Sequence, residues 1–112
     1  AKGNAKRADR STSEGLIAAH EGDGATTMIE LACETDFVAK GDKFVALGER
    51  VLAAVAAAGA ATVEAALAAP VDGSTVAAII DEEAAIIGEK FELRRVARLE
   101  GSQFAVYLHR TN

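Results

Sequence analysis

The chain has 112 residues and a mass of 11.5 kDa, which suits one domain and excludes a large multidomain enzyme. Half of its residues are hydrophobic and 26% are charged, a composition typical of a folded globular protein and not of a disordered one. The 12 basic residues against 17 acidic ones give a net charge of −5, the wrong sign for a protein whose main partner is nucleic acid.

The residues that could hold a cofactor or cross a membrane are few. One cysteine, Cys33, cannot form an internal disulfide, and with only His20 and His109 we expect no zinc site and no cofactor. The most apolar window, residues 51–69, is alanine-rich and interrupted by polar residues, so we expect no membrane span. Residues 1–10 are basic and lack the apolar segment of a signal peptide. The sequence therefore predicts a cytoplasmic protein.

Residues 1–13 are predicted to be a linker or the tail of a helix. They carry four basic residues against one acid, and no apolar residue larger than alanine. Nothing in this segment is expected to anchor it to a core. We therefore place the folded domain at residues 14–112.

Residues 16–33 are predicted to form a β-hairpin. Two short runs flank Glu21-Gly22-Asp23-Gly24, and Asp-Gly between such runs favours a tight turn because glycine tolerates positive φ. Alternation in the second run predicts one buried face, formed by Thr27, Ile29, Leu31 and Cys33. The opposite face is then formed by Thr26, Met28, Glu30 and Glu34.

After Cys33 the apolar spacing changes to three or four residues, which predicts helices. The first helix runs to about Gly59, and its inward stripe is formed by Phe44, Leu47, Val51, Val55 and Ala58. The second is short and alanine-rich; it begins at Thr62 and ends before Pro70.

A turn at Val71-Asp72-Gly73 separates the short helix from a third one. Ser74 or Thr75 is predicted to cap this third helix, and Gly88 to end it. Its inward residues are predicted to be Val76, Ile79, Ile80, Ala84 and Ile87.

Alternation returns in the last segment, which predicts a second hairpin. One face is formed by Phe91, Leu93, Ala97 and Leu99, and the other by Glu92, Arg94, Arg98 and Glu100. Arg95 would share the apolar face, so we expect either a β-bulge or a buried ion pair at this position. A turn at residues 100–102 leads to a final strand that contains Phe104, Val106 and Leu108.

The order hairpin, three helices, hairpin predicts the α+β class. We expect a small antiparallel β-sheet with the helices on one face. No internal repeat and no low-complexity linker divides residues 14–112.

Three groups of residues could have a chemical function, and each also has a simpler structural interpretation. Gly22-Asp23-Gly24 is too short for a nucleotide-binding loop and lies between strands, so it is predicted to be a turn. Asp81-Glu82-Glu83 occupies adjacent helix positions that point in different directions, which is typical of a solvated face. Cys33 and His20 could serve as nucleophile and base, but no third group orients them, which favours a buried structural thiol. The sequence therefore predicts no enzyme activity.

The junction between the first hairpin and the first helix contains a large aromatic residue. Thr35 is suited to cap a short helical turn, with Asp36 at its start and Lys40 at its end. Phe37 then has two interpretations. Its ring either folds down and closes the seam between sheet and helix, or projects and anchors a partner. The residues alone leave both open.

The segment Cys33-Glu-Thr-Asp-Phe-Val-Ala-Lys40 resembles the T-D-F-V-A-K signature of bacterial elongation factor Ts, the family of guanine-nucleotide exchange factors for elongation factor Tu. Further similar segments follow in the family's order: Lys6 to Arg10, Glu14-Gly-Leu-Ile17, Met28-Ile-Glu-Leu31, Ile87-Gly-Glu-Lys90, Leu93-Arg-Arg-Val96 and Leu99-Glu-Gly101. The resemblance implies that residues 1–13 lead from an N-terminal helical domain. It also implies that residues 14–112 are the N-terminal half of the family's core.

The same resemblance implies a function and a partner. The chain would be a translation elongation factor that binds the GTPase elongation factor Tu without contacting nucleic acid directly. Asp36 and Phe37 would insert near the switch region, disturb the Mg²⁺ site and loosen bound GDP, while Thr35 and Val38 would shape the turn. The alternative is a structural or assembly subdomain with no exchange activity, in which Phe37 is packed internally.

Overall fold

The computed structural model describes residues 12–22 and 24–100. The elements follow the order β1 (Glu14–Gly22), β2 (Ala25–Cys33), α2 (Asp36–Ala39), α3 (Asp42–Ala58), α4 (Val63–Leu67), β3 (Pro70–Val71), β4 (Ser74–Thr75), α5 (Val76–Ile87) and β5 (Glu92–Glu100). The final strand predicted around Phe104, Val106 and Leu108 lies outside the described residues, and so does the turn that would lead to it.

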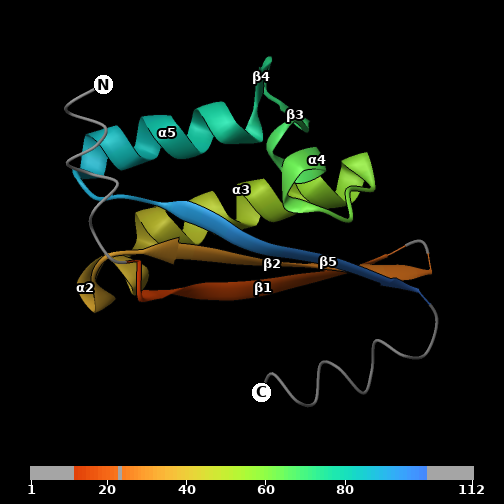
Figure 1. Cartoon of the computed structure of the whole chain (residues 1–112), viewed down its shortest axis with the longest axis horizontal. Coiled ribbons are helices and arrows are strands. Elements are labelled where there is room, and N and C mark those ends of the chain that lie inside the picture. The colour runs from red at the N-terminus through yellow and green to blue at the C-terminus, as the bar shows by residue number, and fades with distance from the viewer. Residues whose placement is uncertain (1–11, 23, 101–112) are drawn as a thin grey trace.

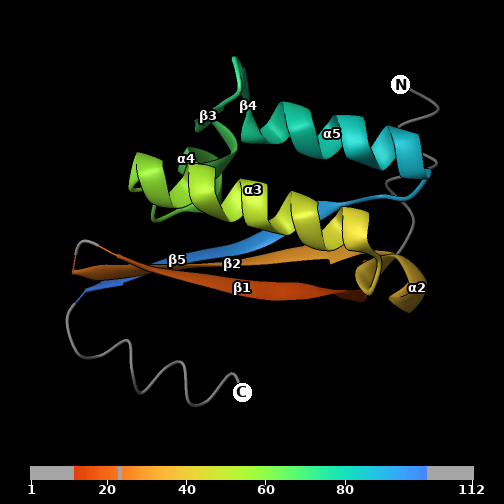
Figure 2. The ribbon, with the colours of Figure 1, turned by 180° about the vertical axis from the view of Figure 1, so that it is seen from behind.

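The described long strands form an antiparallel sheet in the order β1-β2-β5. Figure 1 shows α3, α4 and α5 on the same side of this sheet, and the reverse view in Figure 2 agrees. The strands β3 and β4 form a separate pair that joins α4 to α5 around the predicted turn. The predicted α+β class, with helices on one face of a small antiparallel sheet, is therefore confirmed.

The first hairpin forms as predicted, but its burial differs from the prediction. β1 pairs with β2 from Glu14 opposite Cys33 to Gly22 opposite Ala25. Both faces of β2 are buried, and Met28, predicted to lie on the open face, is only 4% exposed. The prediction of a single buried face is wrong for β2 because side chains of both neighbouring strands also flank its outer face, with Ala19 and Ala97 beside Met28.

The three predicted helices are confirmed as α3, α4 and α5. In α3 the stripe residues Phe44, Leu47, Val51 and Val55 are buried, and Gly59 ends the helix with φ of +67°. Ala58 is an exception, because it lines an open pocket at the end of the helix.

Threonine side chains begin the other two helices. The Thr62 hydroxyl accepts from the Ala65 N–H at 3.1 Å, and the Thr75 hydroxyl accepts from the Ala78 N–H at 3.2 Å. The inward residues of α5 are buried, except that Ile87 is partly exposed while still packing on the core.

A β-bulge in β5 changes which of its residues face the helices. Leu31 pairs with Leu93 while the preceding Glu30 pairs with Arg95, so Arg94 is the extra residue. Cross-strand partners share a face, so Ala97 lies opposite Met28 on the outer face, away from Leu93. The predicted single face of Phe91, Leu93, Ala97 and Leu99 is therefore wrong.

Of the two interpretations of Arg95, the β-bulge is confirmed and the buried ion pair is wrong. A bulge is present beside Arg95, and its Nε lies 3.4 Å from the Glu30 Oε1. The ion pair is not buried, since the Arg95 side chain is 83% exposed. We therefore expect this pair to contribute little to stability.

Of residues 1–13, the structure describes Thr12 and Ser13. Thr12 is buried; its hydroxyl donates to the Glu92 carboxylate at 2.9 Å, and its carbonyl accepts from Arg94 at 2.8 Å. The expectation that nothing in this segment is anchored is therefore wrong at Thr12.

The core fills the space between the inner face of the sheet and the helices. At its centre Phe44 of α3 meets Phe91, which precedes β5, edge to face with ring centroids 5.0 Å apart. Phe44 therefore ties α3 to the segment that leads into β5.

Gly15 is a position at which only glycine fits. It has φ of +156°, and a Cβ there would lie 2.3 Å from the Leu31 carbonyl oxygen of β2. We expect Gly15→Ala to lower the free energy of unfolding by about 2–4 kcal/mol, from backbone strain plus the clash. Urea unfolding measures this. Gly24→Ala is the control, because a Cβ at that positive-φ position meets nothing, and equal losses in both variants would contradict the role of the close approach.

Candidate functional site

The junction after β2 forms a short helix, α2, at the end of the sheet (Figure 1). Thr35 has extended backbone angles, and its Oγ1 accepts from the Val38 N–H at 3.3 Å. The Ala39 N–H donates to the Thr35 carbonyl at 3.1 Å. Asp36 and Lys40 form an exposed ion pair at 3.1 Å. The predicted capped turn is therefore confirmed.

Phe37 projects from this turn into solvent. It is 89% exposed, whereas Val38 and Ala39, the next two residues, pack against the core. The interpretation in which the Phe37 ring closes the seam between sheet and helix is wrong, since these smaller side chains and Phe44 occupy that place. An aromatic ring of this size exposed on an ordered turn is typical of an anchor for a partner.

An open concavity of about 700 Å³ lies beside the ring. Phe37, Val38, Phe44 and Ile87 contribute apolar wall, and Lys43 lies among the charged residues at this site. The turn therefore offers a partner both a projecting ring and a hollow next to it.

A residue that the sequence analysis did not single out holds the base of the turn. The Glu89 carboxylate accepts from the Glu34 N–H at 3.1 Å, from the Thr35 N–H at 3.2 Å and from the Thr35 hydroxyl at 2.7 Å. In return, the Glu34 carboxylate accepts from the Lys90 N–H. One signal in the sequence could have drawn attention to Glu89. It lies in Ile87-Gly-Glu-Lys90, a segment that resembles the family, but the resemblance assigns no role to Glu89.

Cys33 and His20, the candidate nucleophile and base, lie far apart. Cys33 pairs with Glu14 while His20 pairs with Thr27. Six residues along an extended strand span roughly 20 Å. The Cys33 thiol is buried and donates to the Thr35 carbonyl at 3.3 Å. These two residues therefore cannot act together on one substrate.

The Cys33 thiol should react slowly with alkylating reagents. Burial, with a smaller contribution from the charge of Glu89, raises its pKa from 9.0 to about 11. At pH 8 we expect alkylation by iodoacetamide to be about 100-fold slower in the folded chain than in urea, since only the thiolate reacts. The rate should rise about tenfold per pH unit towards pH 11. Mass spectrometry measures the rate, and equal rates with and without urea would contradict the buried placement.

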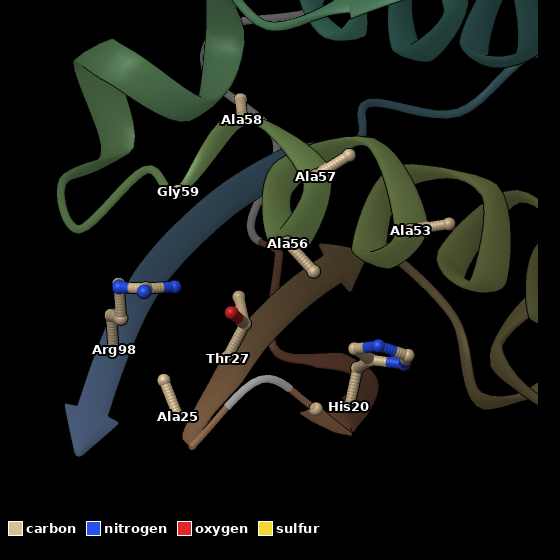
Figure 3. Close-up of a pocket in the computed structure, with 10 residues that line it drawn as sticks. His20, Ala25, Thr27, Ala53, Ala56, Ala57, Ala58, Gly59 and Arg98 are labelled. Carbon is tan, nitrogen blue, oxygen red and sulfur yellow. The ribbon is translucent and has the colours of Figure 1, made fainter.

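His20 instead lines a different pocket, of about 370 Å³, at the end of α3. Figure 3 shows His20 and Arg98 on either side of Thr27, beneath the alanines of the helix. The strand pairing places the three residues in one row across the sheet. Cys33, the other member of the candidate pair, is not among the residues that line this pocket.

The carboxylate run on α5 faces solvent, with Asp81 and Glu82 exposed. Within residues 12–22 and 24–100, no group of three or more His, Cys, Asp or Glu residues is placed to hold a metal ion. In the same described part of the chain, no helix is both long and apolar enough to cross a membrane. The turn at Thr35 to Lys40 is the best candidate for a functional site, because it carries the exposed Phe37 ring and the concavity beside it.

Comparison with known proteins identifies the family. The sequence profile of the family described as "Elongation factor TS" matches residues 34–112, most of the chain. The chain belongs to the elongation factor TS family. The matched part includes the whole α2 turn and the Glu89 that holds it. The candidate site therefore lies within the region that the elongation factor TS profile recognises.

Individual relatives agree with the family assignment. The chain is 68% identical to elongation factor Ts of Leifsonia xyli and of Clavibacter sepedonicus, and 51% identical to that of Micrococcus luteus. These matches cover 100%, 99% and 99% of this chain, and 41%, 40% and 40% of the respective relatives. The chain thus spans about two fifths of the length of these elongation factor Ts relatives.

Proposed function

We propose that the chain acts in translation elongation as part of a guanine-nucleotide exchange factor that binds the GTPase elongation factor Tu. Residues 14–112 form the N-terminal subdomain of the factor's core, and residues 1–13 lead from a preceding helical domain. The proposal places the protein in the cytoplasm, without a cofactor of its own and without direct contact with nucleic acid. Membership of the elongation factor TS family supports it.

The partner-binding residues of this proposal are Thr35, Asp36, Phe37 and Val38. Asp36 and Phe37 insert against the GTPase near its switch region and disturb its Mg²⁺ site, which loosens bound GDP. Thr35 caps the turn and Val38 fixes it to the core. The single observation that carries the proposal is the 89% exposure of Phe37 on a hydrogen-bonded turn.

Such a factor needs no bond chemistry. It must only bind the nucleotide-free GTPase more tightly than the GDP-bound form, and this coupling is reciprocal. Burial of one phenylalanine contributes roughly 1.5–3 kcal/mol, and each 1.4 kcal/mol of differential binding shifts the nucleotide equilibrium about tenfold. The Phe37 ring therefore supplies part of the coupling, and loss of Mg²⁺ from the GTPase, together with further contacts, supplies the rest.

A binding titration tests the proposal. The chain is titrated against elongation factor Tu in two states, GDP-bound with Mg²⁺ and nucleotide-free with a chelator. We expect tighter binding to the nucleotide-free state, by at least about tenfold if one buried ring contributes fully. Equal affinity for both states would contradict exchange activity and favour a structural or assembly role. No binding to either state would contradict the proposed partner.

A further inference from the structure

We propose that Glu89 is a positioning residue that holds the α2 turn in the orientation in which Phe37 meets the GTPase. This inference rests on the proposed function, because it assigns Glu89 a role in partner binding through Phe37. Glu89 itself is only partly exposed and belongs to the segment between α5 and β5.

Packing and helix propensity alone give the α2 turn limited support, although Val38 and Ala39 contact the core. The turn has four residues, and none of them is buried. Isolated helices of fewer than about 12 residues are marginal in water. Hydrogen bonds at the base of the turn therefore add to the packing of Val38 and Ala39 in setting the orientation of Phe37.

Glu89 accounts for three of those hydrogen bonds. Its Oε1 accepts from two consecutive backbone N–H groups, those of Glu34 and Thr35, and its Oε2 accepts from the Thr35 hydroxyl. Hydrogen bonds to an ionised carboxylate are stronger than those between neutral groups. The same Thr35 oxygen accepts from the Val38 N–H, so a chain of hydrogen bonds runs from Glu89 through the cap to the far side of Phe37.

The fold brings Glu89 to the turn from more than 50 residues away in the sequence. Gly88 ends α5 with φ of +87°, and the chain then passes the end of the sheet that carries α2 (Figures 1 and 2). The Glu34 carboxylate bonds to the Lys90 N–H from the opposite direction. The two segments therefore hold each other reciprocally.

Loss of the Glu89 hydrogen bonds should weaken partner binding without changing the maximal rate of GDP release. When only a fraction of molecules has the competent orientation, the apparent dissociation constant equals the intrinsic one divided by that fraction. In a GDP-release assay, Glu89→Ala should therefore raise the half-saturating concentration of the chain by about tenfold, at an unchanged maximal rate. Glu89→Gln keeps one acceptor oxygen and should lie between Glu89→Ala and the wild type.

Two further measurements separate positioning from a general loss of stability. Amide hydrogen exchange at Glu34 and Thr35 should speed up about tenfold or more in Glu89→Ala, while exchange at Ile29 in β2 stays unchanged. In a Phe37→Ala background, Glu89→Ala should cause no further loss of binding, because its effect passes through the ring. Glu82→Ala, which removes an exposed carboxylate of α5, is the matched control.

Unchanged exchange at Glu34 and Thr35 in Glu89→Ala would overturn the inference, and so would an equal loss of binding in the Phe37→Ala background. Failure of the proposed function looks different. If the wild-type chain itself does not accelerate GDP release, the proposed exchange function is contradicted, and Glu89 has no role in exchange. Hydrogen exchange then still decides whether Glu89 orders the turn.

Discussion

Phe37→Ala should abolish most of the chain's effect on elongation factor Tu while leaving the fold intact. The ring is 89% exposed, so its removal opens no cavity, and the free energy of unfolding should change by less than about 0.5 kcal/mol. Loss of a ring that is buried only in the complex should weaken binding to nucleotide-free elongation factor Tu by roughly 10- to 150-fold. Isothermal titration measures the affinity, and urea unfolding measures the stability.

Val45→Ala is the matched control for this change. Val45 is an exposed apolar residue of α3 that does not line the concavity beside Phe37. We expect this variant to bind as the wild type does. A similar loss of affinity in both variants would indicate a nonspecific apolar surface and would contradict the role of Phe37.

Phe44→Ala makes the same chemical change seven positions later and should have the opposite outcome. Phe44 is 1% exposed and packs edge to face on Phe91. Truncation of a core phenylalanine typically costs about 3–5 kcal/mol, a large share of the stability of a small domain. We therefore expect a sharply lower melting temperature and a smaller cooperative unfolding transition by circular dichroism.

A conservative variant makes this second prediction sharper. Phe44→Leu keeps most of the apolar volume and should lose clearly less stability than Phe44→Ala. If Phe44→Ala were no less stable than Phe37→Ala, the assignment of Phe44 to the core and of Phe37 to the surface would be contradicted.

Much of the fold could be predicted because the signals are local. The apolar spacing of α3 and the threonine caps of α4 and α5 depend on residues within one or two helical turns. The Asp-Gly pair between two short runs likewise specifies the first hairpin locally. These elements appear where the sequence predicts them.

The features that could not be predicted depend on contacts between distant segments. Alternation shows which residues of β2 share a face, but not that β5 covers its second edge and helps to bury Met28. The extra residue in β5 moves Ala97 and Leu99 to the outer face of the sheet, opposite Met28 and Thr26. Such a bulge can be recognised only from the pairing of the two strands.

The candidate site also has features that are determined locally and features that depend on distant segments. The Thr35 cap is local and could be predicted, whereas the direction of Phe37 depends on which side chains already fill the seam below it. Glu89 is separated from Thr35 by 54 positions, so no spacing rule connects them. Only the folded arrangement of α5 and β2 brings this carboxylate to the turn.

The most direct test of the central claim is the release rate of fluorescent GDP from elongation factor Tu with Mg²⁺ present. The rate is measured at saturating concentrations of the wild-type chain and of Phe37→Ala, after circular dichroism has verified that both are folded. The account predicts that the wild-type chain accelerates release and that Phe37→Ala leaves it near the spontaneous rate. Equal acceleration by both chains, or none by the wild type although it binds, would contradict the claim that Phe37 on its hydrogen-bonded turn drives exchange.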